Sequence, residues 1–370
     1  MRENQFKLKA ESLGAIFSAL KKSGYKIIGP TVKEEAAAFG FISSPDDLPR
    51  GFSDEQEAGT YRLKKSGENL FFGFANGQRS AKDFLLRHRQ ELWRAVKTGT
   101  GFNVKEEAAP EEKLAFIGVR PCDIAAIKIQ DAVLSSGPYA DGAYKARRKK
   151  SFLIAVDCSK PSAVCFCESM KTGPRAETGF DVALTEISDE NGHRFLMRAG
   201  SAAGEKFLAK LRFEPAGETE KNAAKAVSEK ARAMLKRSLD YGTIKETLYS
   251  AYAHPRWDET ANRCLTCANC TAVCPTCFCV TTEDSTDLAG KTASRARRLD
   301  SCFTLDFTYS HGMGSGRSSV KSRYRQWIIH KLAAWQDQFG TSGCVGCGRC
   351  IAWCPAGIDI TEEARAAQKP

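Results

Sequence analysis

The chain has 370 residues, 42% of them hydrophobic, and carries 15 cysteines and a formal net charge of +11. This length allows two or three domains that each bury a core. No apolar run reaches the roughly 18–20 residues that span a bilayer, and the polar N-terminus lacks the apolar stretch of a secretory signal, so we expect a soluble, cytoplasmic protein with no membrane partner. The basic run at 145–150 has no interleaved aromatic residues, so we predict no nucleic-acid partner either.

The first hundred residues give mixed signals. Apolar residues at helical spacing predict a helix that begins near Phe6 and ends before Gly24. A short apolar run predicts a strand over 70–74, and the pattern that follows predicts a helix over 81–96.

Two short apolar runs, at 114–119 and 152–156, predict buried strands of an α/β sheet. The first is followed by Cys122 and a helical pattern, and the second by Cys158. Because open α/β sheets place ligands at the carboxyl ends of their strands, we expect a site along this edge.

Four cysteines of this region form a possible third 4Fe-4S site beside the two described below: Cys122, Cys158, Cys165 and Cys167. The alternative is that Cys122 and Cys158 are small buried residues, since the C-x-C spacing of the other two is not a standard cluster signature. A second alternative is that a reactive Cys122 at a helix N-terminus binds and reduces a sulfur species.

Strand patterns at 182–187 and 194–198 flank Asn191-Gly192 and predict a hairpin, and helical patterns follow at 218–239 and 244–252. We therefore predict an α/β N-terminal domain followed by a mainly α-helical dicluster ferredoxin domain. The expected limits are 1–217 for the α/β domain, 218–255 for a helical bridge and 256–370 for the ferredoxin domain.

Eight cysteines form two runs with one spacing, C-x2-C-x2-C-x3-C-P, which is typical of paired 4Fe-4S clusters. In such pairs the first three thiolates of a run bind one cluster and the fourth crosses to the other. The predicted iron ligands are Cys264, Cys267, Cys270 and Cys354 at cluster 1, and Cys344, Cys347, Cys350 and Cys274 at cluster 2. A zinc-stabilised module is the alternative, although zinc sites usually have four ligands in two pairs.

The long spacer between the runs contains a helical pattern over 319–339. Its glycine-containing stretch at 311–317 does not complete a dinucleotide-binding loop, and we recognise no flavin or NAD(P) site in the chain. Cys277, Cys279 and Cys302 are expected to pack near the clusters, without an assigned role.

Five segments carry a resemblance to a known family, the beta (iron–sulfur) subunit of cytosolic NAD(P)-linked nickel–iron hydrogenases, also called sulfhydrogenases. These segments are GVRPCDIAAI at 118–127, CFCESMKTGP at 165–174, RCLTCANCTAVCPTCFC at 263–279, DSCFTLDF at 300–307 and SRYRQWIIHKLAAWQDQFGTSGCVGCGRCIAWCPAGIDI at 322–360. The A subunit of anaerobic sulfite reductase is similar. The resemblance extends over about 47–363 and departs from the usual pattern at 73–83.

This resemblance implies a non-catalytic electron-transfer subunit of a hetero-oligomeric oxidoreductase complex. Its partners would be a subunit that binds FAD and NADH or NADPH, and a catalytic subunit, a nickel–iron hydrogenase. The alternative complex is an anaerobic sulfite reductase or another sulfur-reducing enzyme. Because all four cysteines of the possible third site lie within the region of the resemblance, about 47–363, the resemblance also favours a third cluster.

Overall fold

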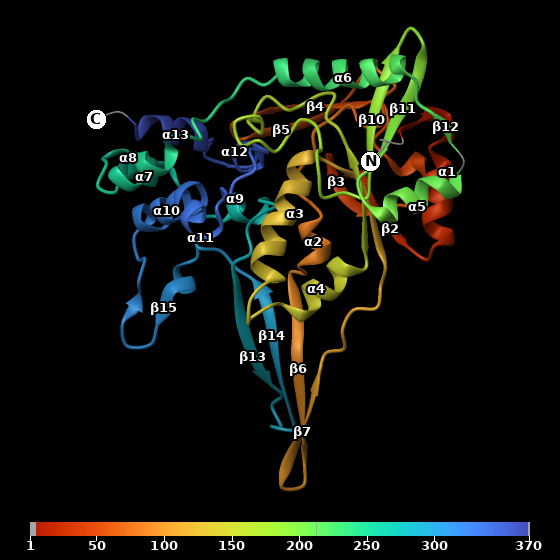
Figure 1. Cartoon of the computed structure of the whole chain (residues 1–370). Coiled ribbons are helices and arrows are strands. Elements are labelled where there is room, and N and C mark those ends of the chain that lie inside the picture. The colour runs from red at the N-terminus through yellow and green to blue at the C-terminus, as the bar shows by residue number, and fades with distance from the viewer. Residues whose placement is uncertain (1–4, 212, 369–370) are drawn as a thin grey trace.

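The computed structural model describes residues 5–211 and 213–368. Its first half is built on an eight-stranded mixed sheet with the order β12-β1-β11-β10-β9-β8-β2-β3 (Figure 1). The bounds in that order are Glu214–Pro215, Gln5–Lys9, Gly192–Ala199, Val182–Asp189, Ser151–Val156, Leu114–Val119, Lys26–Lys33 and Ala36–Phe41. Strands β2, β8, β9 and β10 run parallel, and the outer pairs are antiparallel.

Helices cover both faces of this sheet, so β8 and β9 are buried along nearly their whole length, as parallel strands usually are. Helices α1 and α5 pack on the face that holds Ala115 and Ile117, and α3 and α4 pack on the face that holds Leu114 and Phe116. The helices on this half are α1 (Gly14–Lys22), α2 (Lys82–Leu85), α3 (Pro121–Leu134), α4 (Gly142–Lys149), α5 (Ala202–Leu211) and α6 (Glu218–Ala233).

The strand–helix unit at 114–134 and the hairpin of β10 and β11 agree with the sequence-based expectations. Three expectations for the first hundred residues are wrong. Residues 5–9 form strand β1, because they pair with β11, and the helix begins only at Gly14. The segment 70–74 is buried but irregular, because the N–H groups of Phe71 and Phe72 bind the Glu186 carboxylate at 2.7 and 2.9 Å instead of a neighbouring strand.

The predicted helix over 81–96 is limited to the short α2, and residues Arg89–Thr98 form strand β6. This strand belongs to a second, four-stranded sheet with the order β13-β14-β6-β7, which projects from the body of the molecule (Figure 1). The other three strands are β7 (Gly101–Glu106), β13 (Val280–Thr286) and β14 (Thr292–Leu299). Because β13 and β14 lie between the cysteine runs, the expectation of a mainly α-helical ferredoxin region is not confirmed.

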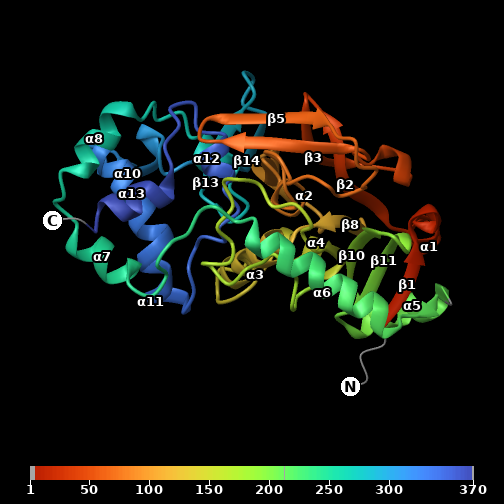
Figure 2. The same cartoon turned by 90° about the horizontal axis from the view of Figure 1, so that it is seen from above.

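The helices of the last third gather at the opposite end of the molecule from β1, β10 and β11 (Figure 2). They are α7 (Ile244–Ser250), α8 (Arg256–Arg263), α9 (Asn269–Ala272), α10 (Val320–Ile329), α11 (Trp335–Phe339), α12 (Arg349–Ala352) and α13 (Ile360–Ala366). A π-helical turn, His330–Ala334, joins α10 to α11, so the predicted helix over 319–339 is continuous. Trp257, Tyr324, Trp327 and Ile328 form the centre of a core that these helices share.

The remaining elements are short. The hairpin of β4 (Phe52–Glu57) and β5 (Thr60–Lys65) reaches the last third of the chain, where the Gly59 N–H donates to the Ile351 carbonyl at 3.0 Å. The others are β15 (Tyr309–Ser310), β16 (Gly314–Ser315) and the 3-10 turns Ala10–Ser12, Pro45–Asp47 and Leu305–Thr308. Within the described residues, no helix combines the length and the apolar character that crossing a membrane requires.

Candidate iron–sulfur centres

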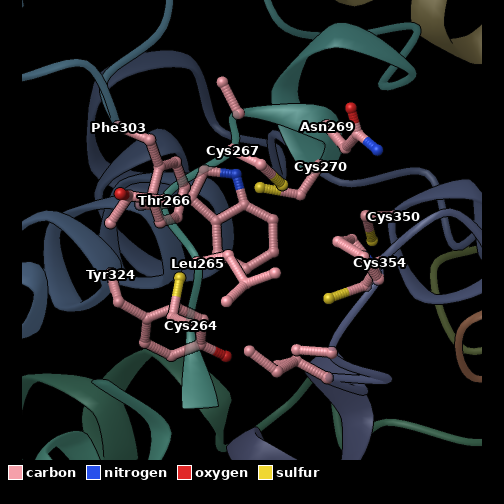
Figure 3. Close-up of a pocket in the computed structure, with 15 residues that line it drawn as sticks. Cys264, Leu265, Thr266, Cys267, Asn269, Cys270, Phe303, Tyr324, Cys350 and Cys354 are labelled. Carbon is pink, nitrogen blue, oxygen red and sulfur yellow. The ribbon is translucent and has the colours of Figure 1, made fainter. Parts of the chain in front are cut away.

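Four predicted ligands, Cys264, Cys267, Cys270 and Cys354, line one cavity in the last third of the chain (Figure 3). The first three come from the end of α8, the following loop and α9, and the fourth follows α12. Phe303, Tyr324 and Trp327 form an aromatic wall of this cavity. The fourth cysteine of the second run therefore lies beside the first three of the first run, as crossed ligation requires.

The other four cysteines of the two runs, Cys274, Cys344, Cys347 and Cys350, are close enough that the pKa of Cys350 is raised by the other three thiols in addition to burial. Burial also raises the pKa of Cys344 to about 12. Thiols with such high pKa values are protonated at neutral pH unless a metal holds them as thiolates. The donor set of four mutually close sulfurs, with Cys274 buried and the other three partly buried, fits an iron–sulfur cluster.

Both runs adopt the same backbone conformation. Each has two residues with positive φ, Thr266 and Ala268 in the first run and Gly346 and Gly348 in the second, and the second residue of each pair caps a short helix. These turns fold the chain tightly, so that cysteines three positions apart face one centre.

A buried lysine lies beside the second set of thiols. The Lys331 ammonium, on the π-helical turn, is 3.4 Å from Cys274 Sγ and 3.5 Å from Cys277 Sγ. It also donates to Thr276 Oγ1 at 3.1 Å and to the Gly343 carbonyl at 3.3 Å. Among the described residues, none of its hydrogen-bond partners is a carboxylate, so its charge balances negative charge on sulfur. The pKa of Lys331 is raised by these thiols although burial acts in the opposite direction.

The four cysteines of the possible third site also line one cavity. Cys122 lies in the first turn of α3, Cys158 follows β9, and Cys165 and Cys167 lie on the loop after it. Burial raises the pKa of all four thiols. These sulfurs lie at the edge where β8 and β9 end.

This third cavity adjoins the second cysteine run, because Cys347 and Arg349 also line it. Arg349 forms a fully buried ion pair with Asp123 of α3 at 2.6 and 3.0 Å. The loop that carries Cys165 is bonded to the same run, since the Phe166 N–H donates to the Gly346 carbonyl at 2.8 Å.

Sequence reasoning missed the charged groups of these sites, Lys331 and the Arg349–Asp123 pair. One signal was available for Lys331, because it follows Ile328 by three positions on the apolar face of its helix, where a lysine needs a buried partner. Nothing in the sequence relates Arg349 to Asp123, which is 226 positions away.

Comparisons with known proteins agree with this geometry. Residues 263–358, which hold both cysteine runs, match the 4Fe-4S dicluster domain. The chain is therefore an iron–sulfur protein of the electron-transfer class. Over 325 residues it is 32% identical to the sulfhydrogenase 2 subunit beta of Pyrococcus furiosus, an alignment that covers 86% of this chain and 92% of that protein. The chain belongs to the family of sulfhydrogenase beta subunits, as the resemblance in the sequence predicted. No solved structure matches it.

Proposed function

We propose that this chain carries electrons through three 4Fe-4S clusters, between a subunit that binds flavin and NAD(P) and a catalytic nickel–iron hydrogenase subunit. The proposed ligands are the two crossed quartets of the cysteine runs and the quartet of Cys122, Cys158, Cys165 and Cys167. A 4Fe-4S cluster, when bound, accepts and donates one electron at a time. The chain's own contribution is to hold the three sets of thiolates in series.

One observation carries this proposal: the cavities of the first and third cysteine sets are each lined in addition by one cysteine of the second set. Cys347 lines the cavity of Cys122 and Cys158, and Cys350 lines the cavity of Cys264 and Cys354. The second set therefore lies between the other two, an arrangement suited to a relay. The relative is a subunit of a sulfhydrogenase, and this supports the proposal that the present chain works with partner subunits.

The number of clusters is tested by iron content. Anaerobically purified protein is expected to hold about twelve irons with three clusters, and about eight with two. Cys122→Ser should lower the count toward eight and leave the signals of the dicluster domain in place. Cys277→Ser, which removes a thiol outside the quartets, should keep twelve. A wild-type value of eight contradicts the third cluster.

The role is tested with pyridine nucleotides. These give up two electrons as hydride, so a flavin must stand between them and one-electron clusters. The isolated chain should be bleached by dithionite but not by NADH or NADPH, and the flavin subunit should make one nucleotide effective. Rapid bleaching of the flavin-free chain by either nucleotide contradicts the proposal.

The identity of the catalytic subunit decides between two complexes. An affinity-tagged chain, purified anaerobically from its own host, should bring down a hydrogenase large subunit. Recovery of a sirohaem-containing sulfite reductase subunit instead favours the alternative complex.

A further inference from the structure

Cys279 and Cys302 belong to none of the three quartets, yet the fold brings them together. Val280 of β13 pairs with Leu299 of β14, and the Asp300 N–H donates to the Cys279 carbonyl at 2.8 Å. The turn that follows β14 therefore returns beside Cys279. The two thiols lie close enough that each shifts the pKa of the other.

This thiol pair lies between a predicted cluster site and an open cavity. On one side, Cys302 packs among the residues around Cys264 and Cys270, and the next residue, Phe303, lines the cavity of Cys267. On the other side, Cys279 lines a separate cavity of about 240 Å³. At roughly 30 Å³ for each water, this volume admits a molecule of several heavy atoms.

The cavity has a basic lining. Lys82, His88 and Arg298 contribute to it, with Asp300 as its acidic residue. Arg298 is paired with Glu283, and His88 with Asp83. The buried Lys82 ammonium donates to the backbone carbonyls of Ala272 and Cys274, both at 2.8 Å, and forms no ion pair within the described residues. The lining favours a small anion.

The two thiols are not equivalent. The hydrogen bond from Cys302 lowers the pKa of Cys279 to about 7, whereas the same contact and burial raise the pKa of Cys302. Since the thiolate is the nucleophile, Cys279 is the thiol suited to attack from the cavity side and Cys302 is suited to resolve the product.

We propose that Cys279 and Cys302 form a redox-active pair that reduces small disulfides bearing carboxylate groups. Cys279 thiolate attacks one sulfur of the substrate, the substrate S–S bond breaks, and the released thiolate takes a proton. Cys302, after losing its proton to water, attacks Cys279 Sγ in the mixed disulfide, which releases the second substrate thiolate and leaves a Cys279–Cys302 disulfide. Two electrons, delivered one at a time from the predicted cluster at Cys270, and two protons from cavity water restore the dithiol. This last step rests on the proposed function.

The first test is peptide mapping of the complete, cluster-loaded protein under non-reducing conditions. After anaerobic treatment with dithiodiglycolate, a small dicarboxylate disulfide, the expected product is a Cys279–Cys302 disulfide. In Cys302→Ser, a mixed disulfide of Cys279 with mercaptoacetate should accumulate. Neither measurement requires electrons from the clusters, so absence of both products overturns the thiol pair and leaves the proposed function untouched.

The second test is turnover with dithionite and dithiodiglycolate, after subtraction of the rate without protein. Cys279→Ser and Cys302→Ser should each slow the catalysed rate at least tenfold with unchanged iron content. Arg298→Gln should lower the rate of dithiodiglycolate reduction several-fold. The rate with the neutral bis(2-hydroxyethyl) disulfide should stay within twofold of wild type. Equal rates in wild type and Cys279→Ser overturn the activity. A further outcome is that dithiothreitol reduces the Cys279–Cys302 disulfide, yet the disulfide stays oxidised when the clusters are reduced. That result overturns the proposal that the clusters supply its electrons.

Discussion

The two cysteine runs share a spacing and a backbone conformation, but their surroundings differ. The first run lies near the surface, with Cys267 exposed and Leu265 66% exposed. The second is enclosed between α3, the π-helical turn and the loop that carries Cys165, with two buried cations nearby: Lys331 lies close to Cys344 and Cys350, and Arg349 lies close to Cys347.

The ligand pattern specifies the type of centre, whereas the surrounding chain specifies the redox properties of that centre. Cluster potentials depend on charge, hydrogen bonds and solvent exposure around the sulfurs. The enclosed set suits a relay inside the molecule, and the exposed set suits exchange across the surface.

The largest expected effect concerns crossed ligation. Because Cys274 lies with the second set, Cys274→Ser should remove or alter the same electron paramagnetic resonance signal as Cys347→Ser. Cys267→Ser serves as the control and should alter the other signal. If Cys274→Ser instead alters the same signal as Cys267→Ser, crossed ligation is wrong, and Cys274 belongs to the cluster near the surface.

The second prediction concerns packing against the enclosed run. A Cβ atom at Gly348 would lie 2.4 Å from the Val164 carbonyl oxygen, in a residue with φ of +71°. Gly348→Ala should therefore lower the free energy of unfolding by more than about 2 kcal/mol and reduce iron content. Iron analysis and denaturant titration measure both. Gly290→Ala, at positive φ but with open space around it, is the control for conformational strain alone and should cost less.

The third prediction concerns the charge beside the enclosed set. An ammonium about 6 Å from a cluster stabilises one added electron by about 3 kcal/mol at an effective dielectric constant of about 20. Lys331→Met should thus lower the midpoint potential of one cluster by roughly 100 mV and leave the others unchanged. A redox titration followed by electron paramagnetic resonance measures the shift. Lys321→Met removes a half-buried charge, paired with Asp258, from the same helical segment and should shift no potential; an equal shift in both variants would contradict a local effect.

The smallest effect is expected in the first run. Ala268 has the same positive φ as Gly348 but carries a side chain. Ala268→Gly relieves this strain at the cost of extra freedom in the unfolded chain, so the free energy of unfolding should rise by less than about 1 kcal/mol. A melting curve detects the change. A marked loss of stability would show that the Ala268 side chain has a packing role.

Sequence reasoning succeeded where local pattern and local contacts agree. The strand and helix around Cys122, the hairpin of β10 and β11 and the long helix with Trp327 are all specified by neighbours in sequence. It failed where distant segments decide. Residues 89–96 belong to a predicted helix but form part of strand β6, because β14 pairs with them, and Glu186 replaces a partner strand for Phe71.

The same division applies to the sites. Fixed spacings identify the ligands of the two runs, because the motif is local. The gathering of Cys122 with Cys167, and the pairing of Arg349 with Asp123, depend on how the sheet and the last third pack together. No local pattern encodes such a contact.

The projecting four-stranded sheet has a consequence for synthesis of the chain. Val96 of β6 pairs with Thr292 of β14, so a strand made early waits for a partner nearly 200 residues later. At about 5–20 residues per second, that wait lasts roughly 10–40 seconds on the ribosome. During this time β6 presents an unpaired edge, and the hairpin also exposes Phe102 and Val104 of β7, so it is prone to association. Newly made chains are therefore expected to depend on holding chaperones more than the finished fold would suggest.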